Sequence, residues 1–456
     1  MTDRIERDSL GEVAVPADAL FGAQTQRALS NFKLSGLCMP PRFLCALGLV
    51  KEMAARVNGE LGELDAERAA AIARAARALA EGRHLEQFPV DVFQTGSGTS
   101  TNMNANEVIA TLASRALGAP VHPNDHVNRG QSSNDCIPTA LHVAAALAVR
   151  DALLPALGAL REAILARARE FDGVLKTGRT HGMDALPIRL GQELGAWAHH
   201  VTLAGERIEA AQPRLLEIAQ GATGVGTGAN THREFRARFA AKLAERTGLA
   251  FTPSRNPFAS LAVPDAALEL HGALRGFAAA LLKITGDLRW MASGPHAGLA
   301  EISLPALQPG SSLMPGKVNP VIPEAVAMAC IQVLGLDAAL GFAAGSGSFQ
   351  LHMAWPLLAW NLDLSLTLLA NGARVLAERV VRGFTVDVAR LAAEARRNPI
   401  LATALVPVLG YERAAEIARR AHAEGRPVRE VAGELSGLDA ATLDRLLDPR
   451  RLTEPG

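Results

Sequence analysis

The sequence contains few aromatic residues, which limits the folds that it can form. Phe, Trp and Tyr together make up 4% of its 456 residues, with a single Tyr, whereas apolar residues make up 49%. Because strands are enriched in β-branched and aromatic residues, a chain rich in Ala and Leu but poor in aromatics favours helices over sheets. The apolar content excludes a disordered chain.

The chain also lacks net charge and is poor in cysteine. Its 46 basic residues balance 46 acidic ones, so neither nucleic acid nor an anionic membrane surface is expected as a partner. The cysteines have no CxxC spacing, which indicates neither a disulfide framework nor a zinc knuckle; they are Cys38, Cys45, Cys136 and Cys330. The N-terminus is charged where a signal peptide would be apolar. No uninterrupted apolar run approaches the roughly 20 residues that span a bilayer. We therefore expect a cytoplasmic protein without a membrane partner.

Long helical patterns dominate from residue 138 onward. The run 139–171 is helical throughout except at Pro155, where a kink or break is expected. Several segments are apolar over most of their circumference, as in 273–284, so they must be covered on all sides. This predicts a long-helix bundle whose outer faces are buried by other subunits. The other long candidates are 192–220, 264–293, 323–344 and 353–382, and a shorter amphipathic run covers 66–82.

Composition divides the chain into three predicted domains. Residues 1–130 are interrupted by Pro, Gly and Asn and are expected to form a mixed helix and loop domain. Residues 131–389 contain the long helices and form the central bundle. Residues 390–456 are charge-rich with shorter helical runs, and they form a small C-terminal helical domain.

Four polar stretches lie between the helical segments. Loops of this composition expose backbone N–H groups and hydroxyls, and the helix N-termini that follow them favour negative charge. Together they predict a binding site for a small polyanion. They are dense in Gly, Ser, Thr, Asn and His, with few acidic groups, and cover residues 95–107, 122–135, 178–187 and 310–324.

Nucleotide and metal sites fit these stretches poorly. Gly310–Lys317 resembles a phosphate loop, but five residues separate its glycines and Val318 follows the Lys, so the hydroxyl that binds magnesium is missing. Residues 221–228 (GATGVGTG) follow a helical pattern with the wrong spacing for a dinucleotide fingerprint, and we expect a flexible turn there unless the segment lies over the site. His122 and His126 are separated by a Pro-Asn-Asp turn and lack a third ligand at a typical spacing.

Most isolated reactive residues have a structural interpretation. Cys136 and Cys330 are expected to be small buried apolar residues. At most one of His199 and His200 is expected to face inward, as a structural histidine. Lys317 differs, because only six of the 46 basic residues are lysines. A lysine in a turn that also holds Ser311, Ser312 and Asn319 indicates that a compact point charge is needed there.

The loop GSSLMPGKVNP (310–320) resembles the signature GSSxMPxKxNP of the fumarase/aspartase superfamily. These lyases eliminate a group β to a carboxylate and release fumarate. The resemblance implies a mainly α, three-domain fold, whose central long-helix bundle forms the core of a homotetramer with active sites shared between subunits. It covers essentially the whole chain, because further stretches match in the family's order: 4–32, 94–110, 122–135, 177–193 and 225–235.

Within the superfamily the chain is most similar to the class II fumarases. Ser97 in GSGT, Ser133 in QSSND and the stretch GAQTQR (22–27) are of the fumarase kind. The resemblance therefore implies reversible anti hydration of fumarate to L-malate. Other stretches are more similar to aspartate ammonia-lyases, namely 99–110, 304–308, 317–324 and 443–453. Four residues depart from both patterns, namely His296, Gln350, His352 and Val406. An ammonia-lyase or another lyase acting on a substituted succinate stays open, as does a scaffold without catalysis.

The resemblance also implies catalytic roles. Ser311, which alone would be interpreted as a helix N-cap, would remove the C3 proton, provided that N–H groups and a nearby positive charge stabilise its oxyanion. His181 would handle the leaving group through a water, held in one tautomer by Glu324. Lys317 would stabilise the charge that develops on the substrate.

The remaining implied positions bind anions. The two carboxylates of a C4 dicarboxylate would be held by Ser97, Thr99, Ser132, Ser133, Asn134, Thr180, Lys317 and Asn319. A secondary anion site would lie at His122, Asn124 and Asp125. The resemblance implies no metal and no organic cofactor.

Overall fold

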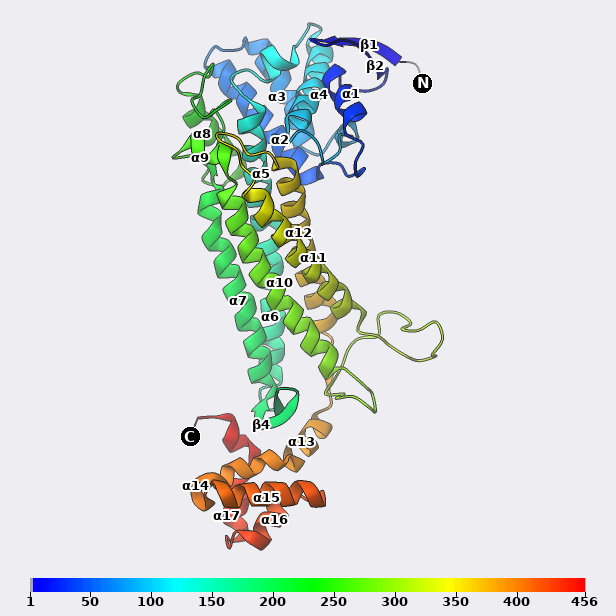
Figure 1. The fold of residues 1–456 in the computed structure, drawn as a ribbon, viewed down its shortest axis with the longest axis vertical. Helices are drawn as coiled ribbons and strands as arrows, with labels where there is room; N and C mark the ends of the chain where they lie inside the picture. Colours follow the sequence, from blue (N-terminus) through cyan, green and yellow to red (C-terminus); the bar gives the residue numbers. More distant parts are fainter. Residues whose placement is uncertain (1–2, 456) are drawn as a thin grey trace. The chain divides into compact units, whose positions relative to one another are not determined.

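The computed structural model describes residues 3–455 and shows a mainly helical chain (Figure 1). The expected mainly α fold with long helices is confirmed. The described residues form two compact units. The first comprises the residues up to Pro155, Ala204–Ala278 and Ile331–Ala370, and the second comprises Ala156–Leu203, Ala279–Cys330 and the residues from Asn371 onward. The three-domain division made from composition stays a prediction.

The first unit contains short and medium helices with a few strands. The strands β1 and β2 pair as an antiparallel hairpin, and β5 pairs with β6 in parallel. The elements are β1 (Asp3–Asp8), β2 (Gly11–Pro16), α1 (Ala23–Asn31), α2 (Pro41–Glu60), α3 (Ala66–Ala80), η1 (Leu85–Gln87), α4 (Thr99–Leu117), η2 (Pro123–Val127), α5 (Ser133–Ala148), η3 (Val149–Leu153), β5 (Glu217–Ile218), α8 (Phe235–Thr247), β6 (Thr252–Pro253) and α9 (Pro257–Ala262).

Helix α2 forms the centre of this unit, since α3, α5 and α8 all pack against it. Its apolar stripe, with Phe43, Leu47, Val50 and Ala54, is buried. A stripe repeating every three to four residues follows from the period of the helix. Glu107 of α4 is also buried, and its carboxylate accepts hydrogen bonds from the backbone N–H groups at the start of α1. Through these bonds Glu107 of α4 satisfies the free backbone N–H groups at the N-terminal end of α1.

Residues 133–170 form one nearly continuous helix. The expected break at Pro155 does not occur, because α6 (Leu154–Glu170) continues through the proline. The irregularity lies just before it, in the π-helical turn η3. A widened turn accommodates a residue that cannot donate a backbone hydrogen bond, so the helix continues without a sharp break.

The bounds of five long helices fall partly in each unit. They are α6, α7 (Leu190–Leu215), α10 (Asp265–Met291), α11 (Val321–Ala344) and α12 (Trp355–Leu376), the last followed by the π-helical turn η4 (Ala377–Val381). The predicted segments 264–293 and 323–344 agree with the observed helices to within two residues, whereas 192–220 ends five residues too late and 139–171 also covers much of α5 and all of η3. The end of 353–382 is π-helical.

The second unit contains a hairpin, a long connection and the C-terminal helices. The segment between α10 and α11, yellow-green in Figure 1, contains only the short strand β7 (Ile302–Ser303). The remaining elements are β3 (Leu175–Thr180), β4 (Met183–Arg189), β8 (Thr385–Val386), α13 (Val388–Arg397), η5 (Pro399–Leu405), α14 (Val406–Leu409), α15 (Tyr411–Glu424), α16 (Val428–Leu435), α17 (Ala440–Leu446) and η6 (Pro449–Thr453).

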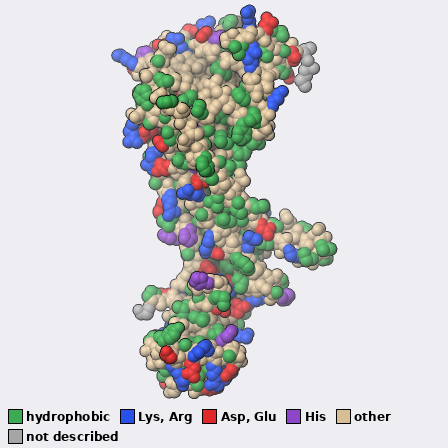
Figure 2. Space-filling view, viewed as in Figure 1, with side chains coloured by type: hydrophobic (Ala, Val, Ile, Leu, Met, Phe, Trp, Pro, Cys, Tyr) green, Lys and Arg blue, Asp and Glu red, His purple; other side chains and the backbone are tan. Residues whose placement is uncertain are grey.

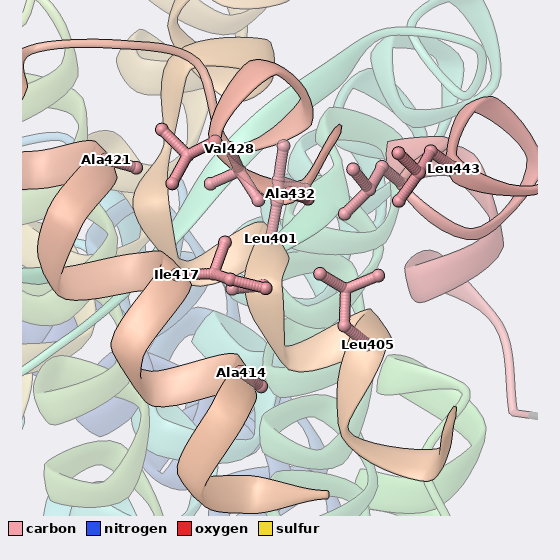
Figure 3. Packing of buried hydrophobic residues seen from close by; sticks show 11 residues of the cluster. Leu401, Leu405, Ala414, Ile417, Ala421, Val428, Ala432 and Leu443 are labelled. Atoms are coloured by element: carbon pink, nitrogen blue, oxygen red, sulfur yellow. The ribbon is translucent and has the colours of Figure 1, made fainter. Parts of the chain in front are cut away.

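The C-terminal helices have a small apolar core of their own (Figure 3). Ile417 of α15 lies among side chains from η5, α16 and α17. The charge-rich pattern of this region is therefore an outer face, and its apolar residues point inward. The labelled residues of this cluster are Leu401, Leu405, Ala414, Ile417, Ala421, Val428, Ala432 and Leu443.

Two helical stretches have the length and hydropathy of a membrane span, although no uninterrupted apolar run was found in the sequence. Ser133–Glu170 and Val321–Ala344 contain 18-residue windows of mean hydropathy 1.7 and 1.8, which tolerate isolated polar residues. The core helix of a soluble protein passes the same test, so this is weak evidence. The first window is 56% buried and the second 33%. Figure 2 shows apolar side chains exposed along the long helices.

Candidate active site

The N-terminus of α5 carries three of the predicted substrate-binding residues. Ser132 is the N-cap, and its side chain accepts a hydrogen bond from the backbone N–H of Asn134 at 3.2 Å. Asp135 completes a capping box by accepting from the backbone N–H of Ser132 at 2.9 Å. The side chains of Ser132, Ser133 and Asn134 are only partly buried. This helix end therefore presents hydroxyls, an amide and the positive end of the helix dipole, a combination that binds anions.

The Gly-rich segment 221–228 lies against this helix end. The buried carboxylate of Asp135 accepts hydrogen bonds from the backbone N–H groups of Gly221 and Thr223, at 3.0 and 2.8 Å. The Asn134 side chain donates to the carbonyl oxygen of Gly224 at 2.8 Å. We expected a flexible turn at 221–228 unless the segment lies over the site. These hydrogen bonds hold it against the predicted site.

The GSGT stretch also lies against α5. A Cβ atom at Gly98 would lie 2.9 Å from Ile137, so only glycine permits this approach. Thr99 begins α4, and one turn later Asn102 donates to the Ser133 hydroxyl at 3.0 Å. The structure therefore brings Ser97 and Thr99 into the same unit as Ser132, Ser133 and Asn134, with α4 linked to the α5 terminus.

The predicted secondary anion site forms one short turn. His122 precedes the π-helical turn η2, and its Nδ1 accepts hydrogen bonds from the backbone N–H groups of Asn124 and Asp125, at 3.3 and 3.1 Å. All three residues are exposed. The geometry explains the local fold of this turn, and its anion-binding role stays a prediction.

In the second unit, His181 lies at the tip of the β3–β4 hairpin. Thr180 pairs with Met183, which leaves His181 and Gly182 as a two-residue turn. Their φ angles are +57° and +75°, as a type I′ hairpin turn requires. Thr180 and His181 are both exposed. The hairpin therefore presents the two residues together on a tight turn.

A buried ion cluster lies at the base of this hairpin. The Lys176 ammonium donates to Glu193 at 2.6 Å and to Glu301 at 2.7 Å, and Arg179 donates to the other oxygen of Glu301 at 2.7 Å. Lys176 and Glu301 are each 1% exposed. Buried ions of opposite charge that contact each other fix geometry, because separating them would leave a buried charge unpaired. The cluster thus anchors the strand that leads to Thr180.

Ser311 lies in a loop and not at the start of a helix. Its Oγ accepts hydrogen bonds from the backbone N–H groups of Leu313 and Met314, at 3.1 and 2.9 Å. Helix α11 begins only at Val321, so the N-cap interpretation of Ser311 is wrong. Two N–H donors directed at one hydroxyl oxygen would stabilise negative charge on that oxygen.

The same loop holds Lys317 and Asn319. The Lys317 ammonium donates to the Asn319 side-chain oxygen at 2.6 Å, and the Asn319 amide donates to the carbonyl oxygen of Gly310. The N–H of Gly310 donates to the carbonyl oxygen of Lys317 at 2.9 Å. These contacts close the base of the loop, so Ser311, Lys317 and Asn319 come from one compact turn.

Glu324 lies in the first turn of α11, as its sequence position predicts. Within the described chain no hydrogen bond joins its carboxylate to His181. The structure therefore places these two residues in one unit without pairing them.

One of the four departures from the family pattern, His352, has a local explanation. His352 is fully buried, where its Nε2 contacts the carbonyl oxygen of Ala343 at 2.7 Å and its Nδ1 accepts from the N–H of Ala354 at 3.1 Å. Its ring also packs edge-on against Trp355. Gln350 and His296 are exposed. Val406 begins α14 beside the C-terminal core.

The cysteines show no activation. Burial raises the pKa of Cys136 and of Cys330 to about 12, which keeps both thiols protonated and poorly nucleophilic. Both are 0% exposed, so Cys136 and Cys330 are small buried residues as expected. His199 and His200 are both exposed on α7, so neither is an inward-facing structural residue. Among residues 3–455 no cluster of His, Cys, Asp and Glu could hold a metal ion.

Sequence reasoning missed a network of buried and half-buried polar residues behind the α5 terminus. Lys51, Asn102 and Asn128 are linked by hydrogen bonds that reach Ser133. A signal was present, because Lys51 follows Leu44 and Leu47 on the apolar stripe of α2, where a charge is unexpected.

Known proteins resemble this chain over its full length. A family model described as lyase matches residues 11–335, and one described as fumarase C C-terminus matches residues 401–454. Fumarate hydratase class II 2 of Pseudomonas aeruginosa is 55% identical and covers 100% of both chains. Fumarate hydratase class II of Thermus thermophilus is 47% identical and covers 100% of this chain and 99% of its own.

Solved structures agree with these relatives. The recombinant class II fumarase from Schistosoma mansoni has a TM-score of 0.97 and 36% sequence identity, with 100% of both chains covered. The fumarate lyase:delta crystallin from Brucella melitensis in native form has a TM-score of 0.90 and 44% identity, covering 98% of this chain and 100% of its own. The chain therefore belongs to the class II fumarate hydratase family of lyases.

Proposed function

We propose that this chain catalyses the reversible hydration of fumarate to L-malate through the residues described above. The observation that supports this most directly is the geometry of Ser311, whose Oγ faces two backbone N–H donors in the loop that also carries Lys317. Removing a proton next to an ionised carboxylate adds a second negative charge to that end of the substrate. A catalyst must stabilise this aci-carboxylate more strongly than the ground state.

The two carboxylates of the substrate are bound by groups that carry no negative charge. The α5 terminus offers hydroxyls, an amide and backbone N–H groups, and Lys317 and Asn319 offer a cation and an amide. These donors are already oriented before the substrate arrives, so they need not reorganise as charge develops. The binding residues are Ser97, Thr99, Ser132, Ser133, Asn134, Thr180, Lys317 and Asn319.

Proton removal falls to Ser311 in its ionised form. The N–H groups of Leu313 and Met314 stabilise the alkoxide, which accepts the C3 proton of L-malate and becomes a neutral hydroxyl. The electron pair of the broken C–H bond moves into the aci-carboxylate. Collapse of that intermediate forms the double bond and expels the C2 hydroxyl group.

Departure of the hydroxyl group requires a proton, which His181 supplies through a bound water. Glu324 of another subunit holds the imidazole in one tautomer. In the hydration direction the same imidazole accepts a proton from the attacking water. We place the two residues in different subunits because no hydrogen bond joins them within the described chain.

A homotetramer would supply that second subunit. Helix α11 exposes Ile331, Gly335, Ala338 and Phe342 at spacings of four, three and four residues. Such a stripe lies along one face of a helix and suits packing against another helix. Ile331 is 58% and Phe342 85% exposed, and burying them between subunits removes this apolar area from water.

Production of fumarate from L-malate, followed by ultraviolet absorbance, tests the proposed reaction. We expect rapid fumarate formation from L-malate and little from L-aspartate or other substituted succinates. The opposite preference would assign the chain to ammonia elimination, in line with its aspartase-like stretches. Failure with every substrate would favour the scaffold without catalysis.

A further inference from the structure

The two wholly buried lysines of the described chain differ in their partners. Lys176 contacts two carboxylates, whereas Lys51 forms no ion pair with any carboxylate of residues 3–455 within 4.0 Å. Lys51 is 0% exposed. A buried cation without a contacting counter-charge is unfavourable, unless an anion completes the site in the working state.

Lys51 lies directly behind the first turn of α5. Its Nζ donates to the side-chain oxygens of Asn128 and Gln131, at 3.0 and 3.1 Å, and lies 3.6 Å from the Cys136 sulfur. Three acceptors match the three N–H donors of an ammonium group. Cys136 is one turn from Ser132, whose carbonyl oxygen accepts its backbone N–H.

The orientations of both amides are fixed by other bonds. The Asn128 amide nitrogen donates to the Gln131 carbonyl at 3.1 Å, and the Gln131 amide nitrogen donates to the Val127 carbonyl at 3.0 Å. The two side-chain oxygens must therefore face Lys51. This arrangement is built to hold a cation.

A chain of hydrogen bonds leads from this cation to the substrate-binding residues. The Asn128 oxygen that accepts from Lys51 also accepts from Asn102 at 3.2 Å, and the same Asn102 nitrogen donates to the Ser133 hydroxyl at 3.0 Å. The buried carboxylate of Asp135 attracts Lys51 electrostatically without contacting it, and its oxygens accept hydrogen bonds from backbone N–H groups.

We propose that Lys51 is a positioning residue for catalysis, whose buried charge is balanced by the substrate carboxylate at the α5 terminus and whose hydrogen-bond chain orients Ser133. This assignment rests on the proposed function, because it takes a C4 dicarboxylate as the ligand. Because Lys51 is shielded from water, its attraction for that carboxylate is stronger than that of a solvated lysine.

Succinate is a suitable probe, since it is a C4 dianion that binds without turnover. In Lys51→Gln we expect roughly tenfold to a hundredfold weaker binding of succinate. KM for fumarate should rise with the dissociation constant. Ligand-free Lys51→Gln should melt no lower than the parent, because the substitution removes a buried charge and leaves both amide oxygens with another donor. The Asn128 oxygen still accepts from Asn102 and Asn106, and the Gln131 oxygen still accepts from Cys136. Structural damage would instead lower stability and affinity together.

Glu52→Gln is the matched control. Glu52 is the next residue of α2 and is equally buried, but its carboxylate contacts Arg56 and Arg77 and not the α5 network. We expect this variant to bind succinate like the parent. Equal affinity of Lys51→Gln and the parent, or an equal loss in both variants, would overturn the proposal.

Lys51→Met is the second variant if Lys51→Gln does not fold. Should neither fold while Glu52→Gln does, Lys51 serves the fold alone and the proposal is wrong. The proposed reaction and the role of Lys51 can fail separately. A parent protein that binds succinate but releases no fumarate from L-malate contradicts the proposed reaction. An active parent whose Lys51 variants bind succinate equally well contradicts only the role of Lys51.

Discussion

Gly310 and Lys317 are in such close contact that a Cβ atom at residue 310 would lie 2.2 Å from the Lys317 carbonyl oxygen. The N–H of Gly310 donates to that same oxygen at 2.9 Å. Any side chain at residue 310 must therefore open the base of the loop that carries Ser311.

Gly310→Ala should displace the loop without unfolding the protein, because the collision is confined to this turn. We expect a local cost of about 1–3 kcal/mol and a large fall in kcat/KM for L-malate. Gly272→Ala is the control, since a Cβ there meets no atom within 4 Å. Normal kinetics of Gly310→Ala would show that the closed loop is not needed for turnover.

Ser311→Ala removes the oxygen that faces the two N–H groups of Leu313 and Met314. We expect kcat to fall by about 10²–10⁴-fold, the usual contribution of a general base. Assembly and melting temperature should stay those of the parent, since Ser311 lies in a largely exposed loop. Fumarate formation at the parent's rate would exclude Ser311 as the base.

His181→Asn should slow malate dehydration about 10²-fold, because asparagine cannot deliver a proton to the leaving group. Asparagine tolerates the positive φ of this position, so the hairpin is kept and the loss reports on chemistry. His422→Asn, on the exposed face of α15, is the matched control. If the two variants were equally active, another residue would supply the proton.

His352 should make the stability of the first unit depend on pH. Burial lowers its pKa below the ordinary 6.5, so the unfolded chain binds a proton more readily than the folded one. The stability is fully present above pH 6.5 and is lost as the pH falls below 6.5 toward the folded pKa. Burial lowers the pKa of His142 and His271 as well, which acts in the same direction.

Melting temperatures measured between about pH 8 and pH 5 test this dependence. His352→Asn should flatten the curve in part, leaving the contributions of His142 and His271. A curve identical to that of the parent would mean that His352 is protonated equally in both states.

Phe342→Glu tests the homotetramer. A charge in the exposed stripe of α11 would be buried without a partner on assembly, so the variant should dissociate into smaller species. Light scattering coupled to size-exclusion chromatography measures this, and activity should fall in parallel because His181 and Glu324 would be separated. Phe258→Glu, at an exposed position of α9, is the control. A tetrameric Phe342→Glu protein would move the interface elsewhere.

The long helices were predictable because their apolar residues are numerous enough to define each segment. The positions where a helix becomes irregular were harder to predict. Pro155 shows where a backbone donor is missing, but whether the helix breaks or widens into η3 depends on the packing of residues around it. The β1–β2 hairpin was missed, since both strands are short and the first is strongly charged.

Residues of the candidate site that belong to a sequence motif were predictable, whereas residues that act through buried contacts were not. The loops holding Ser311 and Ser133 stand out by their small polar residues, and the structure places each at a turn or helix end. Lys51 and Asn128 contribute through three-dimensional neighbours that lie far apart in sequence, so their network could not be derived from either stretch alone.

The left-handed backbone of His181 also limits how this enzyme can diverge. At φ +57° a β-branched residue is strained, and only glycine, asparagine and aspartate join histidine in tolerating such a conformation readily. A descendant that acts on another leaving group can therefore exchange residue 181 for few side chains unless the hairpin itself is rebuilt. New specificity is reached more easily through residues of the flanking strands β3 and β4, whose extended backbone accepts most side chains.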